Sequence, residues 1–468
     1  MTTHLIISAA LLCAIVGFES WRRIQGQPFG LLSVANMVFT LNYCVSPMLL
    51  AFAPGTDFAT GPYGRPLFML QVVESLELTE SSYLNASMLS VLAYGGMIGT
   101  YLGVSRFTKP TPLQVDGIPL RWLISTGLIL GSVAIVALLI YSSQFPAMFI
   151  GTHSPYHSEL YQYDPTGIYK MMKLGNIIRG NVREVSWGFL QIIIMLGVPA
   201  LIMLSAAGLR VAGRQRVILI ALAVVVWMVV FARTYHAAGR MELAISVALI
   251  PLAIVLSMRN QRQAFLGVVA LFVFGMFVGL AKHSFFGQPL DTAMIMLDAQ
   301  VIQFGRSALY MANEFAFPFP IVAHTLETGA ESIGYRYFVD IPLAMLYMLP
   351  SLGGVDTWPE MISHIHERLV PLMLPYDLVS FGYYSLGWGG IAIVFAAMGG
   401  LLAVFDKWLT PGTGWLVQCL RASWMMYLPF RIMYADPYTS MKTGFGLIVG
   451  TFLILGMAWL SKRRAKLA

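Results

Sequence analysis

Long apolar runs alternate with short polar segments along the whole of the 468-residue chain. A helix that crosses a hydrocarbon layer of roughly 30 Å needs about 20 mostly apolar residues, which predicts about eleven membrane-spanning helices. They are expected at residues 4–20, 29–53, 85–105, 122–142, 187–207, 217–233, 240–258, 264–281, 386–405, 413–432 and 442–460. The predicted fold class is therefore all-α, a polytopic membrane helix bundle.

Composition supports lipid as the solvent of this chain. Apolar residues make up 57% of it and charged residues only 11%, whereas soluble globular domains carry roughly 25% charged residues. The formal net charge of +7 does not indicate nucleic-acid binding, because the basic residues lie in short loops between apolar runs rather than in one stripe.

Those basic loops predict the orientation of the chain. Short loops rich in Lys and Arg stay on the cytoplasmic side of a membrane, and alternating the eleven spans puts every basic cluster on that side. The clusters are Arg22/Arg23, Arg106/Lys109/Arg121, Arg210/Arg214/Arg216, Arg259/Arg262, Lys407 and Lys462/Arg463/Arg464/Lys466. The N-terminus is then outside and the C-terminus cytoplasmic. No basic residue precedes the run from Leu5 to about Gly17, so we expect a retained first span rather than a signal peptide.

The outer side carries the larger segments, at 54–84, 143–186 and 282–385. We therefore expect three regions. Residues 1–281 hold spans one to eight with the first two outer loops. Residues 282–385 form a large periplasmic segment with short amphipathic or re-entrant helices. Residues 386–468 hold the last three spans and a basic cytoplasmic tail. Binding and chemistry concentrate on loops held by a rigid scaffold, so the active surface should face outward.

One outer-boundary stretch has the chemistry of an anion site. Arg233, His236 and Arg240 follow each other at i, i+3 and i+7, which is one face of a helix. Arg presents a planar fork that matches phosphate oxygens and keeps its charge. The plainer alternative is that these arginines reach from helix ends to anionic lipid headgroups. The pair with a histidine on the same face favours a functional site.

The large outer segment supplies further candidates. It contains Arg306 on an expected helix at 291–313, and it also contains His324, Glu327, His364, His366 and Asp377. A histidine with a pKa near 6.5 can accept a proton at neutral pH, which suits a general base; a surface role is the simpler alternative for each. Glycines at 382–390 would permit close packing where this segment re-enters the membrane; the alternative is that glycine is simply frequent in membrane helices.

Some chemistries find no matching pattern. The sequence has no Gly-rich phosphate loop ending in Lys-Ser/Thr and no His-Glu-x-x-His pair. Its three cysteines lie in apolar runs without the spacing of a metal site, and neither a metal nor a cofactor is expected. No cytoplasmic segment is long enough for a nucleotide-sugar domain, so a transferase here would use a donor attached to lipid.

The combined pattern resembles the Wzy-type bacterial O-antigen and oligosaccharide-repeat-unit polymerases. The resemblance covers the architecture of the whole chain. At residue level it rests on Arg233…Gly239-Arg240 and on the outer succession Phe317-Pro-Phe-Pro320, Asp340-Ile-Pro342, Ser380-Phe-Gly-Tyr383 and Gly387-x-Gly389-Gly390. The resemblance implies a GT-C-like helix bundle in the bacterial inner membrane. It also implies an enzyme that transfers a growing glycan from undecaprenyl diphosphate to the nonreducing end of another lipid-linked repeat unit, with no cofactor.

The resemblance also implies roles for residues. Arg233 and Arg240, with Arg306 as a third candidate, would hold the diphosphate, where preorganised cations stabilise the charge that develops on the leaving group. The base would be His324, His366 or Asp377, with His236 as the alternative. Expected partners are the lipid-linked donor and acceptor, membrane lipids, a chain-length regulator and a flippase, and no nucleic acid.

Three other functions fit parts of the pattern. An O-antigen ligase would use the same donor with a lipid A–core acceptor. A secondary transporter or lipid-linked oligosaccharide flippase would need cations along a path through the bilayer, and only Arg421 lies well inside an apolar run. That arginine would face a lipid-diphosphate cavity or pack against another helix. A structural partner in an export complex is the third alternative.

Overall fold

The protein is helical throughout the part that the computed structural model describes. That part comprises residues 2–52, 76, 78–107, 112–113, 115, 117–144, 189–236, 252–254, 266–267, 317–329, 334–348, 361–362, 376–410 and 414–467, and it contains no strand. Within it, eight helices are long and apolar enough to cross a membrane. They span Thr3–Ile24, Leu31–Ala51, Glu80–Phe107, Leu120–Tyr141, Phe189–Arg210, Gly213–Phe231, Leu378–Trp408 and Pro437–Arg464. The all-α fold is confirmed for these residues, and their eight long apolar helices support the predicted membrane class.

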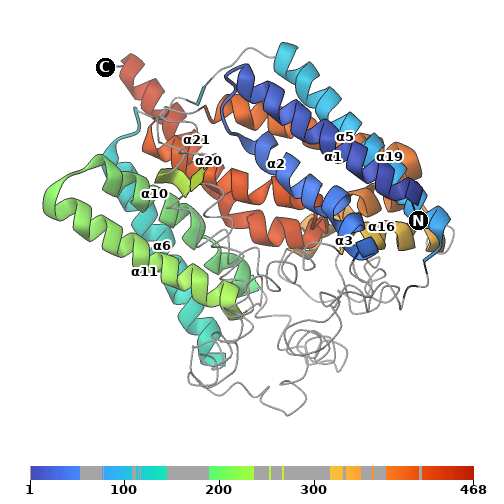
Figure 1. Cartoon of the computed structure of the whole chain (residues 1–468). Helices are drawn as coiled ribbons and strands as arrows, with labels where there is room; N and C mark the ends of the chain where they lie inside the picture. The colour runs from blue at the N-terminus through green and yellow to red at the C-terminus, as the bar shows by residue number, and fades with distance from the viewer. Residues whose placement is uncertain are drawn as a thin grey trace, which may run out of the picture.

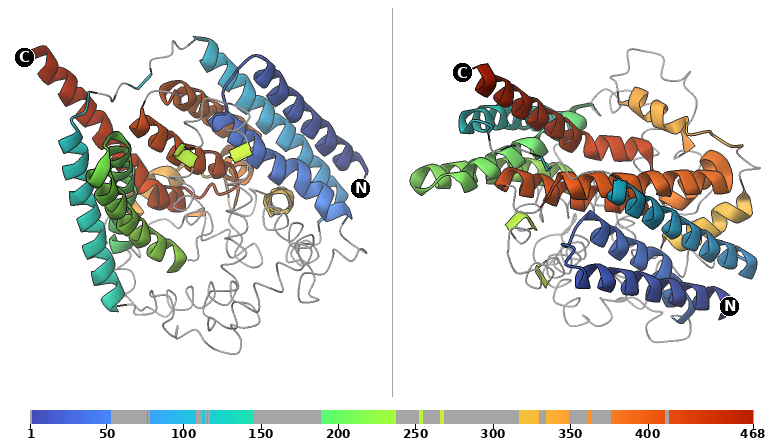
Figure 2. Two further views of the ribbon diagram at one scale, coloured as in Figure 1. Left: turned by 60° about the vertical axis from the view of Figure 1, so that its left-hand side comes forward. Right: turned by 90° about the horizontal axis from the view of Figure 1, so that it is seen from above.

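The helices form two groups joined by a central pair (Figure 1). One group contains α1 (Thr2–Ile24), α2 (Leu31–Thr40), α5 (Glu80–Phe107) and α19 (Leu378–Trp408); the other contains α6 (Leu120–Gln144), α10 (Gly197–Arg210) and α11 (Gly213–His236). Between them lie α20 (Trp415–Tyr427) and α21 (Pro437–Leu467), both of which contact α10. The further views in Figure 2 show the same division.

The tenth predicted span, 413–432, differs from a membrane-crossing helix. Its helix α20 has 13 residues and is followed by a 3-10 turn, η6 (Pro429–Ile432). Thirteen residues rise only about 20 Å, and Pro429 has no N–H to continue the α-helix. The spans predicted at 240–258 and 264–281 lie almost wholly outside the described residues, so about eleven spans stays a prediction.

The directions of the helices follow from which residues meet. Gly96 of α5 faces Phe395 of α19, and nearer the other end Lys407 donates a hydrogen bond to the carbonyl of Ser105, so α5 and α19 run parallel. Gly127 and Gly131 of α6 face Leu204 and Ala200 of α10, an antiparallel pair. Gly446 and Gly450 of α21 meet Met195 and Pro199, so α21 runs parallel to α10. These directions agree with the predicted alternation.

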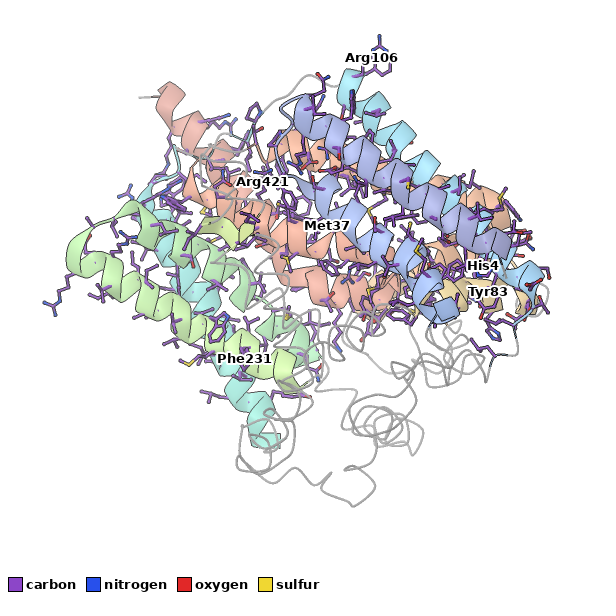
Figure 3. The ribbon with its side chains drawn as sticks, viewed as in Figure 1. His4, Met37, Tyr83, Arg106, Phe231 and Arg421 are labelled. Atoms are coloured by element: carbon purple, nitrogen blue, oxygen red, sulfur yellow. The ribbon has the colours of Figure 1, made fainter. Side chains whose placement is uncertain are left out.

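One consequence is that the basic termini gather at one end of the bundle, here called the basic end. Arg106 marks it at the top of Figure 3, where His4 and Tyr83 lie at the opposite end. Lys407 binds the carbonyl of Ser105, and Arg464 lies over the ring of Trp122 at 4.9 Å. We call the other end, where α16 (Pro318–Thr328) and the first turns of α5 and α19 meet, the opposite end.

Two spans are interrupted close to the opposite end. The second span changes from α2 to a π-helical turn, η1 (Leu41–Val45), before α3 (Ser46–Phe52). Helix α19 is broken at Leu386 and Gly387, where Gly387 has a φ of 58° that glycine adopts without strain. A Cβ on Gly390 would overlap the carbonyl oxygen of Gly382, so the chain folds back on itself here. The close packing predicted for these glycines is confirmed.

Candidate functional site

The candidate site is a group of ionisable side chains at the opposite end, centred on Asp377. Asp377 is the N-cap of α19, and its carboxylate accepts a hydrogen bond of 3.0 Å from the backbone N–H of Ser380. The hydroxyl of Tyr43, which lies in the π-helical turn, donates to the other carboxylate oxygen. Both Tyr43 and Asp377 have no exposed surface. The carboxylate therefore caps a helix and ties the second span to α19.

Burial sets the protonation of this carboxylate. It raises the pKa of Asp377 from 3.8 to about 6, although the hydrogen bonds from Ser380 and Tyr43 favour the charged form. Desolvation disfavours a buried charge, and no basic side chain is among the groups that offset it. Asp377 consequently changes its charge close to neutral pH while remaining out of contact with solvent.

Arg336 and Asp340 form the ion pair of this region. Two guanidinium nitrogens of Arg336 donate to the two oxygens of Asp340 at 2.6 and 2.9 Å. The backbone N–H of Ile362 donates to Asp340 as well, at 2.8 Å. Asp340 is 1% exposed, so its charge is stabilised by a bidentate partner inside the protein.

The loop that carries Arg336 is fixed to the broken part of α19. The backbone N–H groups of Arg336 and Tyr337 donate to the carbonyls of Tyr384 and Ser385 at 3.0 and 2.9 Å. Tyr337 and Phe338 have positive φ values of 51° and 61°, which side chains other than glycine rarely adopt. The break in α19 thus exposes carbonyl groups that anchor this tight turn.

A second arginine lies nearby in the 3-10 turn η6, just before α21. Arg431 is buried, donates to the hydroxyl of Ser440 at 3.0 Å and lies over the ring of Tyr427 at 4.7 Å. The neighbouring Asp436 accepts a hydrogen bond of 3.3 Å from the hydroxyl of Tyr376. Burial, followed by the charge of Asp436, raises the pKa of Tyr376 well above its usual value.

Helix α16 brings a histidine and a carboxylate to the same end. Glu327 accepts hydrogen bonds of 2.8 and 2.7 Å from the backbone N–H and the hydroxyl of Thr79, and another from Ser82. Burial raises its pKa, but these hydrogen bonds and the nearby His324 together hold the pKa below the usual range. His324 itself is half-buried.

Two of the predicted base candidates therefore lie in the described site. Asp377 and His324 are connected through adjacent residues, because Thr325 donates to the hydroxyl of Ser380 at 3.3 Å. His366, Arg240 and Arg306 lie outside the described residues. Arg233 and His236 belong to the last turns of α11, and their side chains also lie outside the described part.

Arg421 packs against another helix, which was one of its two predicted environments. It is 2% exposed and donates to the carbonyl of Phe29, just before α2. Figure 3 shows it away from the opposite end that carries His4 and Tyr83. Arg421 accordingly does not belong to the group around Asp377.

Sequence reasoning missed several members of the site. Arg336 precedes Asp340 by four residues. That spacing places opposite charges side by side on a helix, so the sequence alone could have indicated this ion pair. Tyr43 and Asp436 carry no such local signal, because their partners Asp377 and Tyr376 come from distant parts of the chain. Arg431 follows its ring partner Tyr427 by four residues, a spacing that could also have been noticed.

The arrangement offers buried cations, hydrogen-bond donors and one half-buried histidine at the end of the bundle away from the basic termini. No group of three His, Cys, Asp or Glu side chains that could hold a metal ion occurs among the described residues. Comparison of the chain with protein-family models, with curated proteins and with solved structures found no match.

Proposed function

We propose that this protein is a membrane glycosyltransferase that polymerises lipid-linked oligosaccharide repeat units. It would transfer the growing glycan from undecaprenyl diphosphate to the nonreducing end of a second lipid-linked unit, at the periplasmic face of the bacterial inner membrane. The opposite end of the bundle would be that face, and the basic end would be cytoplasmic.

The observation that carries this proposal is a group of buried ionisable side chains at the opposite end of an apolar bundle; two further buried arginines, Arg22 and Arg421, lie toward the basic end. Arg336, Asp340, Asp377 and Arg431 are all buried or nearly so, and all lie at the end without basic helix termini. Ionisable groups are costly in a membrane protein and typically mark a functional site. A one-sided site suits a reaction between two lipid-linked substrates in one leaflet.

Roles follow from accessibility. The proposed base is His324, because the residue is only half-buried whereas the Asp377 carboxylate is enclosed and hydrogen-bonded to Tyr43 and Ser380. Arg233 and Arg240, with Arg306, are proposed to hold the diphosphate. The acceptor hydroxyl oxygen would form a bond to the anomeric carbon of the growing glycan while the bond from that carbon to the diphosphate oxygen breaks. Undecaprenyl diphosphate would leave, and the proton of the hydroxyl would pass to His324.

The test uses the purified full chain with a lipid-linked repeat unit from its own host, and the products are resolved on a gel. A ladder of products is expected from the natural protein. The double variant Arg233→Ala/Arg240→Ala should give none, and His324→Ala should slow ladder formation by about 10²–10⁴-fold, the usual contribution of a general base. Arg106→Ala, an exposed arginine at the basic end, is the matched control and should leave the ladder unchanged.

Two other results would change the proposed roles or the proposed function. A full ladder from the double variant would remove the diphosphate role from Arg233 and Arg240. One new band, seen only with a lipid A–core acceptor, would identify an O-antigen ligase.

A flippase is the second candidate because α19 is broken at Leu386 and Gly387, and interrupted helices form the substrate sites of many transporters. Movement of a labelled lipid-linked oligosaccharide between the leaflets of a vesicle, without any product on the gel, would support that function instead.

A further inference from the structure

Four arginines lie where three helices end at the basic end of the bundle. Arg121 is in the first turn of α6, Arg210 is the last residue of α10, and Arg463 and Arg464 are near the end of α21. Arg210 is half-buried and the other three are exposed. The described residues at these three helix ends include no acidic side chain that could balance the positive charge.

The packing of the helices places these ends at one level. The glycine contacts between α6 and α10 define an antiparallel register, and continuing it brings Arg121 level with Arg210. The glycine contacts between α21 and the span that contains α10 define a parallel register, which brings Ser461 to the same level. The hydroxyl of Ser461 donates to the carbonyl of Gly117, just before α6, so α21 and the start of α6 meet here (Figure 2).

Two of the arginines are held by different tryptophan rings. Arg464 lies over Trp122 of α6, and Arg463 lies over Trp459 of its own helix, each with its guanidinium carbon 4.9 Å from the ring centroid. Neither guanidinium has a hydrogen bond or an ion pair to another described residue. An arginine that stacks on a ring keeps the N–H groups at the edge of its plane available to a phosphate. Two such cations can each bind one phosphate group.

Arg210 has a donor without an acceptor. Its Nη2 atom is buried and has no hydrogen-bond partner among the described residues, although buried polar atoms almost always have one. The arginines of the neighbouring α1 differ, because Glu19 pairs with Arg22 and Arg23 at 2.8 and 2.5 Å. An oxygen atom from outside the described chain is therefore expected beside Arg210.

The exposed face of α21 is apolar up to these cations. Phe452, Gly456, Trp459 and Arg463 follow each other at i, i+4, i+7 and i+11, which is one face of a helix. Phe452 is 69% exposed and Trp459 is 58% exposed, and a Cβ on Gly456 would meet no atom within 4 Å. Such a face contacts acyl chains in a membrane, and an exposed tryptophan marks the level of the headgroups. The face thus resembles the mould of a phospholipid, with the cation at the level of its phosphate.

We propose that the ends of α6, α10 and α21 bind the headgroup of a phospholipid that carries two phosphate groups. Arg463 binds one phosphate, Arg464 and Arg121 bind the other, and Arg210 donates from Nη2 to the same headgroup. One acyl chain lies along the exposed face of α21. Basic sites between helices at the positive side of a membrane protein suit such headgroups. The inference rests on the membrane class of the protein and not on its proposed transferase activity.

The plainer alternative is that any cation at this end is attracted to an anionic leaflet, and Arg106 provides the measure of that attraction. Arg106 is exposed at the same end but belongs to α5, and it lies apart from the end of α21 (Figure 3). The variant Arg106→Ala removes one positive charge from the same membrane face. A specific site should lose affinity only when its own arginines are changed.

The test is native mass spectrometry of the full chain in a neutral detergent, titrated with cardiolipin, phosphatidylglycerol or phosphatidylcholine. One cardiolipin, which has two phosphates, should bind with a Kd about tenfold below that of phosphatidylglycerol, and phosphatidylcholine should not be retained. Arg463→Ala and Arg464→Ala should each raise the cardiolipin Kd about fivefold, and the double variant about 30-fold, the usual effect of one and two arginines near lipid phosphates. Arg106→Ala should leave this Kd unchanged.

Four results would overturn the proposal. The first is equal affinity of the natural protein for cardiolipin and phosphatidylglycerol. The second is an unchanged cardiolipin Kd in the double variant, when it elutes as a single species in size-exclusion chromatography. The third is the same loss of affinity in Arg106→Ala as in Arg464→Ala, which would indicate attraction without a site. The fourth is displacement of cardiolipin by an equal concentration of pyrophosphate, which would identify a soluble diphosphate as the ligand. No sugar substrate is present, so failure here is separate from failure of the proposed transferase activity.

Discussion

Tyr43 donates its hydroxyl hydrogen to the carboxylate of Asp377, a residue 334 positions later in the chain, and both side chains are completely buried. The contact joins a π-helical turn in the second span to the N-cap of α19. A buried carboxylate depends on such donors to remain charged.

Removal of that donor should destabilise the protein in a pH-dependent way. At pH 8, where Asp377 is charged, Tyr43→Phe should cost about 1–3 kcal/mol of unfolding free energy, because a donor to a buried acceptor is lost. At pH 5 the carboxyl is protonated and the cost should be smaller. Thermal unfolding in detergent, followed by tryptophan fluorescence, measures both. Equal losses at the two pH values would show that the hydroxyl does not act through Asp377.

Asp377 should also make the stability of the natural protein depend on pH. Its pKa of about 6 in the folded state exceeds the value of 3.8 expected when unfolded. The folded state then binds more protons between these values, so stability should fall as pH rises from about 4 to about 6, by up to about 3 kcal/mol, and then level off.

The control for this slope is Asp377→Asn, which keeps the shape of the side chain and removes the titration. Unfolding temperatures of the two proteins across pH 4–8, in one detergent, give the comparison. A slope that persists unchanged in Asp377→Asn would assign it to other carboxylates.

Adjacent glycines at the break of α19 allow a matched pair of substitutions. A Cβ on Gly390 would overlap the carbonyl oxygen of Gly382, whereas the nearest atom to a Cβ on Gly389 would be 3.9 Å away, on Leu386. Gly390→Ala should therefore force the two arms of α19 apart and cost about 1–3 kcal/mol, the usual range for overpacking. Gly389→Ala should be close to neutral. Thermal unfolding tests both, and equal effects would contradict the close contact.

The fold class and most helix positions could be predicted because they depend on local apolar length. The eight long helices of the described part fall on predicted spans, and the glycines at 382–390 form the expected close contact. The span predicted at 413–432 is divided into α20 and the 3-10 turn η6, because Pro429 interrupts the α-helix and an apolar average does not register a single proline. The function proposed from the resemblance stays a prediction.

The site was less predictable because its contacts are long-range. Asp377 and His324 were chosen for their chemistry alone, and nothing local indicated that Asp377 would meet Tyr43. Side-chain contacts between spans are not encoded in the hydropathy pattern.

A capping contact at the basic end gives a fourth prediction. Asp406 accepts hydrogen bonds from the backbone N–H groups of Leu31 and Leu32, at 2.7 and 3.3 Å, at the start of α2. Asp406→Ala removes an acceptor for free N–H groups at a helix N-terminus and should cost about 0.5–2 kcal/mol. Asp406→Asn retains an oxygen acceptor and should cost less. Thermal unfolding distinguishes them, and equal losses would show that charge rather than capping matters.

The pair Arg336–Asp340 gives the last prediction, because its two members differ in burial. Asp340 is 1% exposed, and Arg336 supplies two of its hydrogen bonds at 2.6 and 2.9 Å. Arg336→Met should therefore leave a buried, uncompensated carboxylate and cost about 3–5 kcal/mol. The double variant Arg336→Met/Asp340→Leu removes both charges and should recover part of that loss. Thermal unfolding of the single and double variants forms a double-mutant cycle. Additive losses would show that the two side chains act independently, whereas recovery in the double variant would show that Arg336 stabilises the opposite end of the bundle by neutralising Asp340.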